Sequence, residues 1–242
     1  MQSQLSPEQI DTYRENGFLA IEGFLDRAEV ERLREILATA GLPDDAAARP
    51  DDRRRRLDTQ RMDVWRTDER VRAFCLDPRL GEMACALEGL DGVRLWHDRV
   101  EVKPAWGDPT GWHMDTPSLP FTSPGTCTFW CALIDTNLRN GCLYFVAGSH
   151  RRRIRTNGSP RLDGLRLLHP EWEFVEPVPC PVRAGALVVH NGDTAQAASM
   201  NITPRPRPAY ALTWMPAGAT FDDAASADPA DLDDRCPLVY TR

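Results

Sequence analysis

His113 and Asp115 lie two residues apart in the run Gly111-Trp-His-Met-Asp-Thr116. Side chains along a β-strand alternate between its two faces, so an imidazole and a carboxylate at this spacing share one face. These groups are two of the three members of the 2-His-1-carboxylate facial triad, which holds non-haem Fe(II) and leaves coordination positions open. The pair is also a frequent chance pattern, so its meaning depends on a third ligand and on the surrounding sequence.

The elements that must position this pair are predicted to be β-strands. From residue 92 onward, short apolar segments are separated by clusters of Gly, Pro, Asn and Asp. Strands at regular spacing with turn signals between them indicate a sandwich or a barrel. The predicted strands cover residues 93–103, 127–134, 142–146, 186–190 and 210–214.

The first 90 residues are predicted to be mainly helical and to pack on the barrel. Ser6 and Gln9 form a capping box around Pro7, and Gly17 ends the helix that follows. Asp26 caps a second helix over 27–40, a short strand covers 18–21, and a third helical stretch over 68–89 breaks near Pro78. We expect loops over 42–60 and over the tail 216–242. The chain is therefore predicted to be a single domain over 1–242, divided into 1–90, a core over 91–215, and the tail.

The amino-acid composition restricts the kinds of molecule that the protein is expected to bind. The chain has 242 residues and a formal net charge of −7, which argues against nucleic acid. The sequence has no signal-peptide pattern and no apolar stretch long enough to cross a bilayer, so we expect a cytoplasmic protein without a membrane partner. Seven cysteines without a CxxC pair are typical of free thiols in a reducing compartment. A small-molecule substrate is the expected partner.

Several motifs, in order along the chain, resemble the phytanoyl-CoA dioxygenase-like family of Fe(II)/2-oxoglutarate-dependent oxygenases. The Trp-His-Met-Asp run resembles the metal motif of that family, and Asn-Gly-Cys-Leu followed by Gly-Ser-His resembles a second characteristic stretch. The order of these motifs argues against chance similarity. The segments that carry the resemblance are 5–25, 95–104, 112–115, 140–150, 185–192 and 201–207.

The resemblance implies a mostly β fold with flanking helices, the double-stranded β-helix or cupin-like jelly roll, with a metal at one mouth. It implies Fe(II) as metal and 2-oxoglutarate as co-substrate, which is decarboxylated to succinate during turnover. His113 and Asp115 would be iron ligands. The implied activity is that of a dioxygenase (an oxidoreductase) that hydroxylates a small organic metabolite, in secondary metabolism by analogy alone.

The same resemblance assigns residues to the co-substrate and the substrate. In the family, an arginine eleven residues after the second iron-ligating histidine binds the distal carboxylate of 2-oxoglutarate, to which its planar fork is suited. Arg207 lies eleven residues after position 196. Lys103, the only lysine of the chain, and Trp130 resemble residues that help bind 2-oxoglutarate. Trp106 and Trp112, beside the metal motif, are candidates for the substrate pocket, although aromatic residues also simply fill space.

Position 196, where the family has its second iron-ligating histidine, is glutamine. Three interpretations stay open. Gln196 ligates iron through its amide oxygen, which is a poorer donor than imidazole for Fe(II) and would lower the affinity. Alternatively, His190 at the end of the preceding strand is the third ligand. In the third interpretation, the protein has lost the standard triad and binds a ligand or catalyses a non-oxidative step such as isomerisation or cyclisation.

Overall fold

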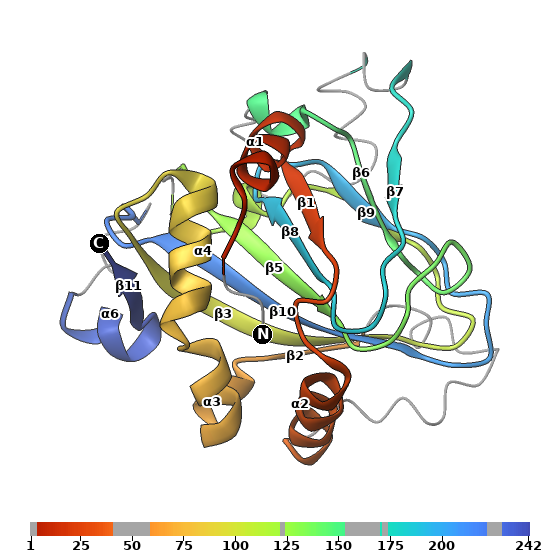
Figure 1. Cartoon of the computed structure of the whole chain (residues 1–242), viewed down its shortest axis with the longest axis horizontal. Helices are drawn as coiled ribbons and strands as arrows, with labels where there is room; N and C mark the ends of the chain where they lie inside the picture. The colour runs from red at the N-terminus through yellow and green to blue at the C-terminus, as the bar shows by residue number, and fades with distance from the viewer. Residues whose placement is uncertain (1–3, 41–58, 122–123, 153–169, 171–173, 222–228) are drawn as a thin grey trace.

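Two antiparallel β-sheets face each other, and helices cover the outer face of the larger sheet (Figure 1). This computed structural model describes residues 4–40, 59–121, 124–152, 170, 174–221 and 229–242. Among these residues, no helix is both long and apolar enough to cross a membrane.

The larger sheet has the strand order β1-β8-β5-β10-β3-β11, with β2 also paired to β3. Its long central pair, β3 and β10, is antiparallel and carries a β-bulge. The strands of this sheet are β1 (Phe18–Ile21), β2 (Thr59–Met62), β3 (Gly92–Lys103), β5 (Cys127–Ala132), β8 (Leu187–Asn191), β10 (Arg207–Pro216) and β11 (Leu238–Thr241).

The smaller sheet has the order β4-β9-β6-β7 and is also antiparallel. Its strands are three or four residues long, and side chains such as Leu143 and Ala198 pack against Trp130 and Ala209 of the larger sheet. Two facing antiparallel sheets form the predicted jelly roll, so the fold class is confirmed. The strands of the smaller sheet are β4 (Thr110–His113), β6 (Leu143–Phe145), β7 (Val178–Cys180) and β9 (Gln196–Ala198).

The helices begin at the predicted caps. Ser6 and Asp26 each form a capping box, at the start of α1 (Pro7–Asn16) and of α2 (Arg27–Thr39). The third helical stretch is divided, as predicted, into α3 (Glu69–Cys75) and α4 (Pro78–Glu88). Apolar side chains of these helices form one buried core with the outer face of the larger sheet, including Leu33, Val71, Leu87, Phe129, Val189 and Leu212.

The inner face of the larger sheet is unusually polar at β3. In the β3–β10 register, His97 lies opposite Thr213, Arg99 opposite Ala211, Glu101 opposite Ala209 and Lys103 opposite Arg207. Alternation along β3 therefore turns four polar side chains toward the interior of the jelly roll, whereas Val100 and Val102 join the apolar core outside.

Two predicted loops are corrected. Residues 59 and 60, at the end of the predicted loop 42–60, belong to β2, because Thr59–Met62 pairs with Arg99–Val102 at the edge of β3; residues 42–58 lie outside the described residues. The tail 216–242 contains α6 (Pro229–Arg235) and β11. Strand β11 supplies backbone partners to the start of β3, and Arg94 donates hydrogen bonds to Asp233 and to the carbonyl of Cys236.

A buried carboxylate, Asp98, lies under the helices on the outer face of β3. The Tyr210 hydroxyl donates to Asp98 Oδ2 at 2.6 Å, and the Trp65 amide lies 3.3 Å from both carboxylate oxygens. Burial raises the pKa of Asp98 to about 6, although these hydrogen bonds act in the opposite direction. Ionised Asp98 therefore weakens the folded state near neutral pH.

The free energy of unfolding is expected to fall with rising pH, relative to that of Asp98→Asn. The pKa of Asp98 is higher in the folded chain than its ordinary value of 3.8. The stabilising contribution of protonated Asp98 to the free energy of unfolding is thus fully present below the unfolded-state pKa. It is lost as the pH rises through the folded-state pKa. Between about pH 4.5 and about pH 8, the difference between the two proteins should change by about 2 kcal/mol. Urea unfolding at both pH values measures it, and a constant difference would contradict the assignment.

Candidate active site

His113 and Asp115 meet across a turn and not along one strand. Strand β4 ends at His113, and Asp115 has helical backbone angles (φ −77°, ψ −47°) at the start of a 3-10 turn, so the predicted continuous strand is wrong. The Asp115 and Thr116 amides both donate to the Gly192 carbonyl, at 2.9 and 3.0 Å, and these bonds fix the turn. The turn still brings Asp115 Oδ1 to 3.7 Å from His113 Nε2.

His113 is oriented by its own strand. Its Nδ1 lies 2.8 Å from the Gly111 carbonyl oxygen, a contact that requires the proton on Nδ1. The lone pair of Nε2 then points toward the Asp115 side of the ring and is available to a metal ion.

Asp115 is buried and accepts hydrogen bonds on both oxygens. Gln196 Nε2 donates to Oδ1 at 2.9 Å, and Thr128 Oγ1 donates to Oδ2 at 2.8 Å. Burial raises the pKa of Asp115, but the charges of His190, Arg99 and His113 and the Thr128 hydrogen bond outweigh burial and hold the pKa at about 2. The carboxylate is therefore ionised at neutral pH.

Gln196 and His190 lie on different sides of this carboxylate. Gln196 is the cross-strand partner of His113 and contacts Oδ1, the oxygen that His113 also faces. His190 Nδ1 lies 3.9 Å from Oδ2 and has no hydrogen-bond partner among the described residues. Burial lowers the pKa of His190 to about 4, so its ring is neutral.

His113 and Asp115, together with Gln196, offer a set of donor atoms that is suited to Fe(II). Among the described residues, no three His, Cys, Asp or Glu side chains group closely enough to hold a metal ion. The amide of Gln196 is one candidate for the third donor, and His190 on the Oδ2 side of Asp115 is the other. A half-turn of that amide exchanges its nitrogen for Oε1 beside Asp115 Oδ1. The set is then one imidazole nitrogen, one carboxylate oxygen and one amide oxygen.

Arg207, at the start of β10, is a buried cation with unused donors. It is 1% exposed, and its Nε and Nη1 have no hydrogen-bond partner among the described residues. Its Cζ lies 5.1 Å from the centre of the Trp130 ring. Buried polar groups are nearly always hydrogen-bonded, and an arginine fork matches a carboxylate. The interior at Arg207 therefore fits an anionic ligand.

Lys103 and Trp130 lie beside Arg207, as the sequence prediction requires. Lys103 is the cross-strand partner of Arg207, and its Nζ donates to the Asp108 carbonyl at 2.8 Å and to Thr110 Oγ1 at 3.1 Å. Trp130 Nε1 donates to Glu101 Oε2 at 3.0 Å, which fixes the indole ring.

Sequence reasoning missed three interior residues: Arg99, Glu101 and Thr128. Arg99 Nε and Glu101 Oε1 form an ion pair at 2.5 Å beneath Trp130. Arg99 and Glu101 alternate with Lys103 along β3, a period-two pattern that the sequence displays. Thr128 lies in an apolar strand, where no pattern marks it as the partner of a distant carboxylate.

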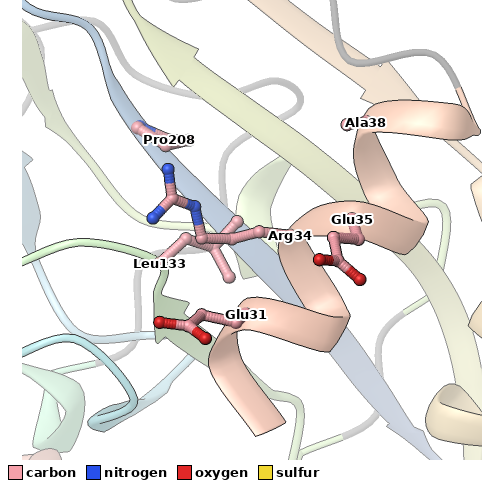
Figure 2. Close-up of a pocket in the computed structure, with 6 residues that line it drawn as sticks. All are labelled: Glu31, Arg34, Glu35, Ala38, Leu133 and Pro208. Carbon is pink, nitrogen blue, oxygen red and sulfur yellow. The ribbon is translucent and has the colours of Figure 1, made fainter. Parts of the chain in front are cut away.

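The two tryptophans predicted to line the substrate pocket have different surroundings in the structure. Trp106 is 54% exposed in the turn between β3 and β4. Trp112 packs against Met114, Val146 and Ala195, on the face of β4 opposite to His113. A surface pocket of about 380 Å³ lies at α2 and the larger sheet, lined by Glu31, Arg34, Glu35, Ala38, Leu133 and Pro208 (Figure 2).

Comparison with known proteins places this arrangement in a family. The family model for phytanoyl-CoA dioxygenase (PhyH) matches residues 13–209, which span β1, the candidate site from Arg99 to Arg207 and the start of β10. The chain belongs to the phytanoyl-CoA dioxygenase family. The family predicted from the sequence motifs is thereby confirmed.

Relatives of this phytanoyl-CoA dioxygenase family member align over nearly its whole length. Phytanoyl-CoA dioxygenase domain-containing protein 1 of Bos taurus is 28% identical, covering 90% of this chain and 92% of the bovine protein. The non-heme alpha ketoglutarate dependent carbocyclase SnoK from nogalamycin biosynthesis is 26% identical, with a TM-score of 0.82 and 99% of each chain covered. The epimerase SnoN is 27% identical, with a TM-score of 0.77, covering 96% of this chain and 98% of SnoN.

The predicted cofactors are those of the family. The SnoN structure contains Fe3+, alpha ketoglutarate and nogalamycin RO. The SnoK structure is that of an alpha ketoglutarate dependent enzyme. Iron and 2-oxoglutarate thus accompany this fold in its structurally characterised relatives.

Proposed function

We propose that this family member is an Fe(II)- and 2-oxoglutarate-dependent oxygenase that hydroxylates a small organic metabolite. The observation that carries the proposal is Arg207, a buried guanidinium inside a family jelly roll, two of whose nitrogens have no hydrogen-bond partner in the part of the chain that the structure describes. A dicarboxylate co-substrate supplies the missing acceptor. Bound iron, with 2-oxoglutarate and O₂, would supply the oxidising power to break a substrate C–H bond.

The residues around Arg207 would hold the distal carboxylate of 2-oxoglutarate. Arg207 would donate hydrogen bonds from Nε and Nη1 to this carboxylate. The ammonium group of Lys103, on the neighbouring strand, would add a second positive charge. Trp130, fixed by its hydrogen bond to Glu101, would form an apolar wall beside the chain of the co-substrate. Burial of these groups excludes water and strengthens each electrostatic contact.

The metal would be held at the opposite end of the interior by His113 Nε2, Asp115 Oδ1 and Gln196 Oε1. Thr128 occupies Asp115 Oδ2 through a hydrogen bond, so a single carboxylate oxygen faces the metal position. Because an amide oxygen is a weaker donor than imidazole, we expect lower Fe(II) affinity than in a His-Asp-His site.

A second candidate function is a non-oxidative enzyme or a ligand-binding protein. It is favoured by the protein hydrogen bonds that already satisfy both oxygens of Asp115, one of them from Gln196 in the place of the family histidine. Ring closure and epimerisation are the reactions named for SnoK and SnoN, which are themselves alpha ketoglutarate dependent, so this fold also supports outcomes other than hydroxylation.

Release of succinate separates the two functions. Anaerobic titration with Fe(II) in the presence of 2-oxoglutarate is expected to show one iron per chain. Admission of O₂ should then yield succinate from 2-oxoglutarate, even without a substrate, at a slow uncoupled rate. The control is protein without added iron, which should yield none. If the protein binds one 2-oxoglutarate per chain but binds no iron and releases no succinate, the second function is favoured. If it binds neither iron nor 2-oxoglutarate, the first function is refuted.

A further inference from the structure

The inner face of β3 carries more functional groups than the co-substrate requires. Lys103 and Glu101 serve the Arg207 end through their contacts there. His97 and Arg99 continue the same row toward the other end of the strand, and the proposed mechanism gives neither a role. Both lie on the face that is turned toward the smaller sheet.

His97 lies near the candidate metal site. Its cross-strand partner on β10 is Thr213, whose hydroxyl is 3.2 Å from Thr128 Oγ1. Thr128 in turn donates to Asp115 at 2.8 Å. The row on β3 thus runs from the Asp115 end, at His97 and Arg99, to the Arg207 end, at Lys103. A substrate that reacts at the metal must approach the first two residues.

Arg99 is held in a geometry that leaves its donor groups for a ligand. Its Nε is bound to Glu101 Oε1 at 2.5 Å, and no hydrogen bond from its Nη groups is found within the described chain. The residue opposite on β10 is Ala211, whose methyl group leaves the guanidinium uncovered on that side. A guanidinium fixed through Nε presents its two Nη groups to an acidic oxygen.

The charges of the inner wall are unbalanced after the co-substrate is counted. Arg99, Lys103 and Arg207 are cations, and the acids near them are Glu101, placed among them by the β3–β10 register, and Asp115, whose charge acts on Arg99. Fe(II) and the doubly charged 2-oxoglutarate would add two charges of each sign, so one positive charge of this wall would remain without a counter-charge. An uncompensated charge in a low-dielectric interior is unfavourable, so a further anion is favoured at Arg99.

A β-bulge adds an aromatic surface to these polar groups. The register between β3 and β10 shifts between Thr213 and Trp214, which makes Trp96 the extra residue beside His97. The centroid of the Trp96 ring lies 6.2 Å from the centroid of the His97 ring. The corresponding centroid distances are 5.2 Å to Phe121 and 6.2 Å to Phe221. Trp96 is partly exposed, so part of this aromatic surface is open to a ligand.

His97 complements Arg99 because it is a neutral polar group without a partner. Its Nε2 is buried and has no hydrogen-bond partner among the described residues. Burial lowers the pKa of His97 to about 4, and the nearby Arg99 acts in the same direction. A neutral imidazole accepts or donates one hydrogen bond.

We infer that His97 and Arg99 bind an acidic oxygen of the primary substrate, an aromatic carboxylate or phenolate, and that Trp96 contacts its ring. The inference rests on the proposed function, because it assigns the substrate end of the same interior.

Matched acids and amides test this substrate class. The probes are benzoate, 2-naphthoate and 2-anthracenecarboxylate, each paired with its amide, titrated calorimetrically against anaerobic protein with Fe(II) and saturating 2-oxoglutarate. At least one acid should bind about 10-fold or more tightly than its amide, the effect of a charged hydrogen bond. Arg99→Gln should abolish this preference, and Arg99→Lys, which keeps the charge, should retain part of it.

Titration of 2-oxoglutarate itself separates this inference from the proposed function. Arg99→Gln should bind 2-oxoglutarate as the wild type does, because Arg207 and Lys103 are intact. If no acid binds better than its amide, or if Arg99→Gln keeps the preference, the inference is wrong while the oxygenase proposal stands. If Arg99→Gln loses 2-oxoglutarate binding, Arg99 belongs to the co-substrate site and the inference is wrong. If the wild type does not bind 2-oxoglutarate, the oxygenase proposal itself fails.

Discussion

Replacement of Arg207 by glutamine is expected to weaken 2-oxoglutarate binding by about 100-fold or more, the usual cost of removing one partner of a buried charge pair. The guanidinium is 1% exposed, and two of its nitrogens have no hydrogen-bond partner among the described residues. Glutamine retains hydrogen-bonding capacity but removes both the positive charge and the fork. Calorimetric titration with 2-oxoglutarate, with Fe(II) present and O₂ excluded, measures the change.

Two variants control for indirect effects at this position. Arg205→Gln removes an exposed arginine two residues earlier and should leave the affinity unchanged. Arg207→Lys keeps the charge without the planar fork and should give an intermediate loss. Wild-type affinity in Arg207→Gln would show that the co-substrate carboxylate lies elsewhere, and the proposed function would lose its main support.

Replacement of Gln196 by histidine is expected to tighten Fe(II) binding by at least about 10-fold, since changes in residues that only support metal ligands already alter affinity by about 10–100-fold. Histidine would supply the imidazole that the resemblance to the family predicts at this position of β9, opposite His113 on β4. It also removes the amide hydrogen bond to Asp115 Oδ1, which frees that oxygen for the metal. Anaerobic Fe(II) titration measures the affinity, and succinate release should rise with iron occupancy.

His190→Ala and Gln196→Ala decide which side chain completes the site. If Gln196 is the ligand, Gln196→Ala should lose Fe(II) binding and His190→Ala should largely keep it. This expectation follows from the geometry, because His113 and Gln196 share Asp115 Oδ1 whereas His190 faces Oδ2. The reverse result would identify His190 as the ligand.

The strong local signals of the sequence predicted helices α1 to α4 and the positions of the long strands, whereas α6 was not predicted. The capping boxes at Ser6 and Asp26 supply hydrogen-bond acceptors to the first backbone N–H groups of each helix from residues close in sequence. They can therefore be recognised without knowledge of the tertiary structure. The eleven-residue spacing from position 196 to Arg207 led to the prediction of a co-substrate anchor, which stays a prediction; the structure places Gln196 at the start of β9 and Arg207 at the start of β10.

Other features depended on contacts between distant segments. Strands β4, β7 and β9 have only three or four residues, too few for a period to be recognised. Strand β11 exists because the edge of β3 offers it backbone partners. Which oxygen of Asp115 each neighbour contacts depends on the turn that carries Asp115. The carbonyl of Gly192, in the connection between β8 and β9, accepts the hydrogen bonds that hold this turn.

Lysine chemistry on this chain is confined to one buried position. Lys103 is the only lysine in the sequence, and its side chain is fully buried between the two sheets. Acylating reagents therefore reach a lysine only when the jelly roll opens locally, which happens at a rate set by the free energy of that opening. The acylation rate of this single ammonium group is thus a direct measure of how often the interior is exposed.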